Sequence, residues 1–243
     1  GSFSSYMDGI RSYPNGIARL NADGTLDSTF QSNGDEIDYE FNPGEQGTDG
    51  IIYDMIVLSD GKIIIGGQFD NYSHSPIYNL ARLNSNGTLD TTFSGGGSSS
   101  SINSIALQSD GKIIFGTSPF GLGRLNVNGS NDSTFSVNTV GGLTIFKVVV
   151  QNDNKILAGG FRVGTSSEKR FFKYNSDGTN DTTFDTGVGI TDGLVSTISL
   201  QTDGKIIIGG DFRSYGVSRD RIIRINNTVE ALSTNTFFNT EFS

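Results

Sequence analysis

Two short segments of alternating apolar and polar character recur along the chain. The first has two apolar runs separated by a polar turn, as in IVLSDGKIIIGGQF at 56–69. The second has an apolar run, an Asn- and Gly-rich turn and a phenylalanine, as in YNLARLNSNGTLDTTF at 78–93. Short apolar runs bounded by turn residues are typical of β-strands. The pattern therefore predicts a chain built from repeated strands.

The lysine of the first segment gives the length of the repeat. Successive copies of this lysine are separated by 50, 43 and 50 residues. A repeat of this length is typical of one four-stranded blade of a β-propeller. No window shows the period of an amphipathic helix over three turns without an intervening glycine. The lysines are Lys62, Lys112, Lys155 and Lys205.

Turn residues support this assignment. Asp-Gly pairs such as Asp60-Gly61 join the two apolar runs, and this dipeptide favours a type I′ hairpin turn. A glycine pair such as Gly66-Gly67 follows the second run, where the missing side chains permit close backbone approach. We expect the runs before these glycines to lie near the buried inner strands. These runs are 63–65, 113–115, 156–158 and 206–208.

We predict an all-β fold, a β-propeller built from four-stranded antiparallel blades. The chain holds about 4.5 repeats, which suits a five-bladed propeller or part of a larger one. It is expected to be a single repeat-built domain. The partial repeat is 1–30, the acidic insertion is 31–50, and the full repeats are 51–93, 102–135, 143–184 and 194–237.

The order of the two segments, LQ-DGKIIIGG-F followed by I-RLN-DGTLD-TF, resembles the delta-60 repeat over nearly the whole chain. This β-propeller-type repeat occurs in large bacterial surface or secreted proteins and in some phage structural proteins. The resemblance implies an extracellular, cell-surface or virion-associated location, and the family has no established enzymatic activity to carry over. Departures from the pattern are Asp153-Asn154 in place of Asp-Gly and Gly116-Thr117 in place of the glycine pair.

Composition narrows the function classes. The 243 residues are 34% hydrophobic and 18% charged, which describes a globular chain. The net charge of -9 disfavours binding to a phosphate backbone, so we expect no nucleic-acid partner. No apolar run approaches the roughly 20 residues of a membrane-spanning helix, so we expect no membrane insertion. The lack of cysteine excludes disulfides and thiolate metal sites.

The second segment places a cation eight residues before an aspartate in four copies. These charges could form a ring around a channel or a structural pair that braces each turn. We favour the structural pair, because a contact that builds a blade is needed once in every blade. The recurrent phenylalanines are expected to pack between blades. The positions are Arg19, Arg82, Arg124, Lys173 and Arg224; Asp27, Asp90, Asp132 and Asp181; and Phe30, Phe93, Phe135, Phe184 and Phe237.

The turn at 21–27 also has the alternating polar pattern of a calcium loop. Asn21, Asp23 and Asp27 would be the ligands, although the distant bidentate glutamate of an EF-hand is missing. Asn and Asp stabilise tight turns without metal, and we favour that interpretation and no cofactor. His74 is the only histidine, and no nucleophile or phosphate-binding motif occurs. We therefore predict that the chain is not an enzyme.

Two aromatic groups are candidate binding residues. Tyr39 and Phe41 lie among the acids of the insertion, and irregular loops on a regular scaffold often carry recognition. Tyr6, Tyr72 and Tyr215 recur three residues after a phenylalanine. Exposed tyrosines at these positions could stack on sugar faces, whereas packing between blades is the structural alternative.

We predict a non-enzymatic structural or assembly module of a large extracellular or virion-associated protein. The expected partners are further copies of the chain or neighbouring subunits, joined through the incomplete repeats at 1–30 and 222–243 by main-chain pairing. The alternative is an adhesion or receptor-binding propeller that binds glycans or proteins. A polysaccharide-degrading enzyme is the last choice, because the dense acidic group of the insertion has no base among its residues.

Overall fold

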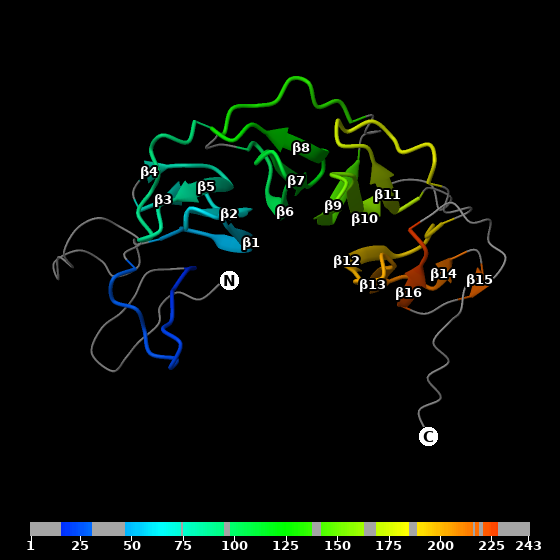
Figure 1. Ribbon diagram of the computed structural model, residues 1–243, viewed down its shortest axis with the longest axis horizontal. Helices are drawn as coiled ribbons and strands as arrows, with labels where there is room; N and C mark the ends of the chain where they lie inside the picture. Colours follow the sequence, from blue (N-terminus) through cyan, green and yellow to red (C-terminus); the bar gives the residue numbers. More distant parts are fainter. Residues whose placement is uncertain are drawn as a thin grey trace. The chain divides into compact units, whose positions relative to one another are not determined.

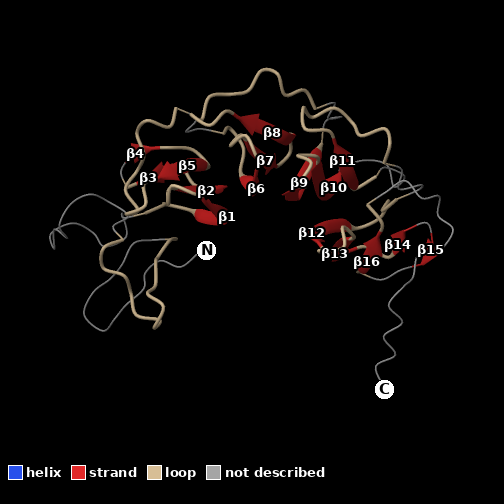
Figure 2. Cartoon of the chain, in the orientation of Figure 1, coloured by secondary structure: helices blue, strands red, loops and turns tan. Residues whose placement is uncertain are grey.

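The computed structural model describes residues 16–30, 47–73, 75–94, 98–137, 142–162, 169–184, 189–215, 217–218 and 221–227. All the regular elements in these ranges are strands (Figure 2). The prediction of an all-β fold is therefore confirmed. Over the same ranges, no helix has the length and apolar character needed to cross a membrane.

Four three-stranded sheets, here called blades, follow one another along the chain (Figure 1). In each blade the middle strand pairs with a strand on either side. In the first, third and fourth blades these pairs are antiparallel. The first blade is β1 (Ile51–Val57), β2 (Ile63–Gln68) and β5 (Leu80–Leu83); the second is β6 (Ile102–Leu107), β7 (Ile113–Thr117) and β8 (Gly121–Leu125); the third is β9 (Leu143–Val150), β10 (Ile156–Arg162) and β11 (Phe171–Tyr174); and the fourth is β12 (Leu194–Leu200), β13 (Ile206–Asp211) and β16 (Ile222–Ile225).

Two blades also carry a small two-stranded hairpin between their second and third strands. The first blade inserts β3 (Asn71–Tyr72) and β4 (Ser75–Pro76). The fourth blade inserts β14 (Ser214–Tyr215) and β15 (Val217–Ser218). The chain divides into two compact units, which are Gly1–Leu107 with Gly111–Phe115 and Arg124–Asp132, and Gln108–Asp110 with Gly116–Gly123 and Ser133–Ser243.

In the first three blades, the predicted fourth strand is reduced to a single bridge. In the first blade this bridge joins Leu83 to Leu89. The chain turns immediately afterwards, because the Phe93 amide donates to the Asp90 carbonyl at 3.1 Å. The next residues therefore close a turn and do not extend the strand. The equivalent bridges are Leu125–Asn131 and Tyr174–Asn180.

The hairpin turns differ from the predicted type I′ geometry. Only Gly61 of the Asp60-Gly61 pair has a positive φ, at 82°, and its amide donates to the Leu58 carbonyl at 2.9 Å. This is a three-residue loop with glycine in the left-handed position. The Asp60 carboxylate accepts a hydrogen bond from the Lys62 amide at 3.0 Å, which stabilises this form. In the third blade Asn154 takes the glycine position with φ 63°.

Within each unit, the core lies where the middle strand of one blade approaches the first strand of the next. In the first unit, a Cβ added to Gly66 would lie 2.7 Å from Ile102 Cγ2, so glycine is required for the close approach of β2 to β6. Phe93 joins Ile102 and Ile105 in the same buried cluster. In the second unit, Phe184 packs on a cluster that includes Leu157, Phe171, Val195, Ile198 and Ile208.

Candidate functional site

A buried aspartate binds two cations in each of three successive repeats. Asp90 Oδ2 lies 2.6 Å from Lys62 Nζ and 2.8 Å from Arg82 Nε. We call this group the carboxylate centre. The equivalent distances are 2.9 Å to Lys112 and 2.8 Å to Arg124 at Asp132, and 2.8 Å to Lys155 and 3.7 Å to Lys173 at Asp181.

The strand register brings these three side chains together. Lys62 directly precedes β2, and Arg82 of β5 pairs with Ile64 of β2, so the two cations come from adjacent strands. The Asp90 amide donates to the Arg82 carbonyl at 2.9 Å, which places the carboxylate beside the guanidinium. The centre therefore depends on both repeat segments of one blade.

The second oxygen of the aspartate is also occupied. Asp90 Oδ1 accepts hydrogen bonds from the Thr92 amide at 3.0 Å and the Thr92 hydroxyl at 2.6 Å. Asp181 receives the same pair from Thr183, at 3.1 and 2.6 Å. A buried carboxylate with donors on both oxygens is held in its charged form.

These contacts shift the pKa values of the aspartates. Burial alone raises the pKa of Asp90, but hydrogen bonds from Lys62, Thr92 and Arg82 outweigh burial and hold it far below its usual range. The same balance, with Lys155 and Thr183 as donors, lowers the pKa of Asp181 to about 2. Burial lowers the pKa of Lys173, and the charge of Asp181 opposes that effect. The centres are thus ion pairs at neutral pH.

The centres of Asp90 and Asp181 also reach the following repeat. Arg82 Nη1 donates to the Val127 carbonyl at 2.7 Å, in the turn that follows β8. Two other cations make the equivalent contact with the next turn. Arg19 Nη1 donates to the Ser85 carbonyl at 2.5 Å, and Lys173 Nζ donates to Asn227 Oδ1 at 2.8 Å.

A phenylalanine ring lies against the same cation. The Arg82 guanidinium carbon is 4.6 Å from the centroid of the Phe93 ring. The equivalent distances are 4.9 Å for Arg19 and Phe30 and 5.0 Å for Lys173 and Phe184. Cation–π contact at this distance is favourable. In these three repeats the recurrent cation, aspartate and phenylalanine therefore form one contact network.

The sequence pattern indicated the pairing of arginine with aspartate, but the role of the lysine was missed. In the sequence, Lys62, Lys112 and Lys155 marked the spacing of the repeat, and no contact with the aspartate was predicted for them. The available signal was that lysine recurs at the same position in all four copies. In the fourth blade Lys205 instead contacts Asp203, and Arg224 of β16 has Leu232, not aspartate, eight residues later in the sequence.

The turn of Asn21, Asp23 and Asp27 is held by its own hydrogen bonds. Asp23 Oδ1 accepts from the Thr25 amide at 2.9 Å and hydroxyl at 2.6 Å. Asp27 Oδ1 accepts the same pair from Thr29, and its Oδ2 lies 2.8 Å from Arg19 Nε. Among the residues that the structure describes, no three His, Cys, Asp or Glu side chains gather as a metal site.

The candidate binding tyrosines occupy different positions. Tyr72 of β3 is fully buried, and its hydroxyl donates to the Gly87 carbonyl at 2.6 Å. It is therefore unavailable to stack on a sugar. Tyr215 lies in β14. Among the recurrent phenylalanines, Phe135 lies against Gly178 of the next repeat. The candidates Tyr6, Tyr39, Phe41 and Phe237 lie outside the described residues, as does His74.

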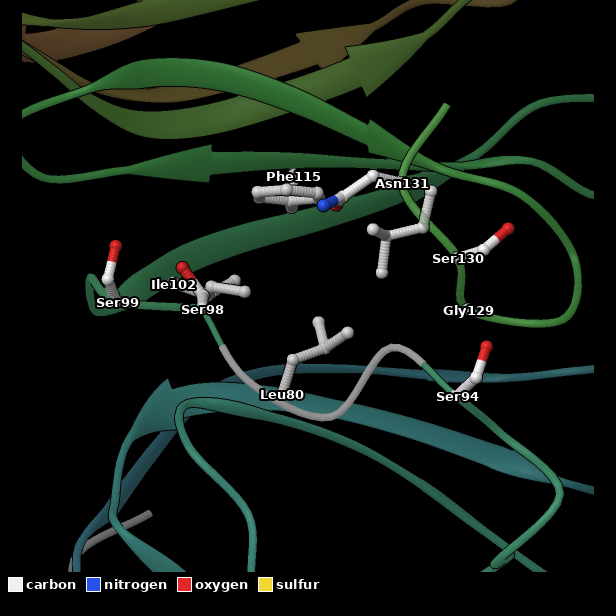
Figure 3. Close-up of a pocket in the computed structure, with 10 residues that line it drawn as sticks. Leu80, Ser94, Ser98, Ser99, Ile102, Phe115, Gly129, Ser130 and Asn131 are labelled. Carbon is white, nitrogen blue, oxygen red and sulfur yellow. The ribbon is translucent and has the colours of Figure 1, made fainter. Parts of the chain in front are cut away.

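One pocket of the first unit lies between β5 and the second blade (Figure 3). Its volume is about 310 Å³. Leu80 points into it from one side, and Asn131 extends toward the ring of Phe115 on the other. Serine side chains contribute to its lining. A wall that combines apolar side chains with a few polar groups is typical of small-ligand sites.

The blades, their repeat length and their order define the class of protein as a β-propeller. The chain belongs to the family described as "Domain of unknown function (DUF5122) beta-propeller". That family's model matches residues 1–30, 58–93, 151–184 and 201–228, which are more than half of the chain. The propeller family is thus confirmed, and the narrower similarity to the delta-60 repeat stays a resemblance. No curated protein matches the chain.

Solved structures with similar folds include two extracellular domains described as parts of hybrid two-component systems from B. thetaiotaomicron. Both are 19% identical to this chain; they cover 65% and 76% of it, with TM-scores of 0.43 and 0.47. The chain spans only 19% and 22% of these two structures. A gluconolactonase from Xanthomonas campestris is 16% identical, with a TM-score of 0.47, and the match covers 80% of this chain and 62% of that one. Similarity this distant transfers no activity or location.

The prediction that the chain is not an enzyme is nevertheless corrected. Propellers described as gluconolactonases are among the structures that resemble it. The prediction relied on the absence of known motifs, and an active site assembled from scattered loop residues leaves no such motif in the sequence.

Proposed function

We propose that this chain is a structural propeller module of a larger extracellular or virion-associated protein. The observation that carries the proposal is the repeated carboxylate centre, whose cation in the Asp90 and Asp181 copies also contacts the turn of the next repeat. Asp90, Asp132 and Asp181 each use the same chemistry, once per blade. Contacts that recur once in every repeat couple neighbours in repeat proteins. The module would hold adjoining parts of the protein in a fixed arrangement.

Two further observations support this role. Asp90 and Asp181 are charged, buried and bonded on both oxygens, so they provide rigidity and have no oxygen left for substrate. The proposed location rests on the resemblance to the delta-60 repeat of surface, secreted and phage structural proteins. The runner-up is a glycan- or protein-binding propeller that uses Tyr39, Phe41, Tyr6 or Tyr215.

The coupling is tested by replacing the cation that joins two repeats. In Arg82→Met the contacts with Asp90 and the Val127 carbonyl are lost, so urea unfolding should begin earlier and become less cooperative. Arg213→Met is the matched control, because Arg213 is exposed. Equal urea midpoints and slopes for the two variants would contradict the proposed coupling.

Association with further copies is a separate expectation. Light scattering at micromolar concentration should show species larger than 25.9 kDa, and deletion of residues 1–30 should abolish them. The physical reason is that unpaired strand edges favour addition of another strand. A monodisperse monomer in both forms would exclude self-association as the assembly mechanism.

A further inference from the structure

The pocket of Figure 3 corresponds to a space that is filled in the preceding repeat. There the occupant is Tyr72, whose side chain is completely buried. Its ring packs in a cluster with Ile17, Ile52, Ile65 and Leu83. Its hydroxyl donates to the Gly87 carbonyl. The first blade therefore contains a bound phenol group supplied by its own chain.

The two spaces have matching walls. With the repeats aligned on the DGK and RLN positions of their two segments, equivalent residues are Ile17 and Leu80, Thr48 and Ser98, Ile52 and Ile102, Ile65 and Phe115, Leu83 and Leu125, and Gly87 and Gly129. Of the first members, the four apolar residues pack in the cluster with Tyr72, Gly87 accepts its hydrogen bond, and Thr48 forms a β-bridge with it. The second member of every pair lines the pocket.

The pocket is open because the second blade lacks the hairpin that carries the tyrosine. In the first blade, β3 and β4 lie between β2 and β5 and bring Tyr72 inward. In the second blade only residues 118–120 separate β7 from β8. The ring of Phe120 in this connection is 66% exposed and does not line the pocket. Within the described part of the chain, no residue donates a hydrogen bond to the Gly129 carbonyl.

The lining is more polar than that of its counterpart. Asn131 takes the position of Leu89, which packs on the cluster around Tyr72. The side-chain amide of Asn131 has no hydrogen-bond partner among the described residues, and the hydroxyl of Ser99 has none among them either. Polar groups in this arrangement can orient a ligand that bonds to them. The walls thus suit a ring that bears a hydroxyl group.

We propose that this pocket binds a phenolic ring in the position that Tyr72 occupies in the preceding repeat. The ring would pack between Leu80 and Phe115, and its hydroxyl would donate to the Gly129 carbonyl. A volume of about 310 Å³ accommodates such a ring. The ring is either part of a free phenolic compound or a tyrosine side chain of another protein. This inference is independent of the proposed structural role.

The first test measures binding of p-cresol, the side-chain analogue of tyrosine, by isothermal titration calorimetry. We expect p-cresol to bind at one site and toluene to bind at least about fivefold more weakly, because toluene cannot donate a hydrogen bond worth about 1 kcal/mol. Equal affinities for p-cresol and toluene would overturn the proposal. Binding of methyl glucoside without binding of p-cresol would overturn it as well.

Two matched variants locate the site. Ser99 is exposed and lines the pocket, so Ser99→Phe should obstruct it and lower p-cresol affinity at least about tenfold. Ser199→Phe places the same ring at an exposed position of β12 and should leave the affinity unchanged. Unchanged binding in Ser99→Phe would place the ligand elsewhere and overturn the assignment.

A third variant tests the correspondence between the two spaces. Tyr72→Ala removes the internal phenol, so folded protein should bind two molecules of p-cresol where the natural chain binds one. Circular dichroism checks that the variant is folded. A folded variant that still binds one molecule would contradict the correspondence. The tests on the natural chain and on Ser99→Phe do not depend on this variant.

The source of the ring is distinguished by a peptide-like probe. N-acetyltyrosinamide carries the same phenol on a short backbone. Affinity equal to that of p-cresol would support a tyrosine from another chain, whereas binding of p-cresol alone would support a free phenolic compound. Failure of both probes to bind would overturn the proposal.

Discussion

The first and fourth blades differ in the carboxylate centre, although both carry its cations. In the first blade, Asp90 draws Lys62 and Arg82 into a buried group. In the fourth blade Lys205 contacts Asp203, whose side chain is 48% exposed. The comparison indicates that the aspartate, not the cations, creates the buried centre. It also predicts that identical substitutions in the two blades will have different effects.

The largest difference should come from removal of the aspartates. Asp90→Ala leaves two cations in a buried site without their carboxylate, which should destabilise the protein by about 3–5 kcal/mol. Asp203→Ala removes a surface pair and should cost less than about 1 kcal/mol. Thermal and urea unfolding measure both. Similar losses for the two variants would show that the buried centre has no special role.

The aromatic part of the centre should give the next largest effect. Phe93 is 7% exposed, lies against Arg82 and belongs to the core, so Phe93→Ala should cost about 3 kcal/mol or more. Phe184→Ala should cost less, because Phe184 is only partly buried. An unchanged melting temperature for Phe93→Ala would contradict its place in the core.

Acid should weaken the blades that have a complete centre. The unfolded chain protonates aspartate near pH 3.9, whereas Asp181 in the folded chain has a pKa of about 2 and that of Asp90 is also well below normal. Stability from these groups is therefore present above about pH 4 and is lost as the pH falls toward about 2. Asp90→Asn should reduce the dependence of urea stability on pH in this range. An identical pH profile in the variant would argue against the ion pair.

The lysines should give the smallest effect. Lys62→Met removes one of two cations from Asp90 and should cost about 1 kcal/mol, whereas Lys205→Met should be nearly neutral. Unfolding midpoints measured in parallel distinguish the two. An equal and substantial loss in both variants would show that the lysines stabilise the blades in some way other than through the aspartate.

The fold was predictable because the repeat is regular. The recurring lysine and the Asp-Gly turns give the blade length and the hairpins. The fourth strand was not predictable, because its length depends on a turn that starts immediately at Asp90. The turn type also differed, because the Asp60 carboxylate bonds to the backbone two residues later.

The site was only partly predictable. Arg82 and Asp90 are eight residues apart, and their recurrence indicated a pair. Lys62 lies 28 residues from Asp90 in the sequence and Val127 lies 45 from Arg82, so only strand pairing and blade packing bring them together. The second blade has the pocket because it lacks the hairpin that carries Tyr72 in the first blade. The sequence did not show that Tyr72 is buried in the core, so it could not indicate that the equivalent space would be open.

Three of the recurrent cations contact the turn of the next repeat, and these contacts give the repeats a direction. Arg19 reaches forward to Ser85, Arg82 to Val127, and Lys173 to Asn227. During synthesis on the ribosome, a blade therefore emerges before the acceptor for its own cation has been made. Each newly translated repeat completes the one before it, so the chain gains its final rigidity one blade behind the growing end.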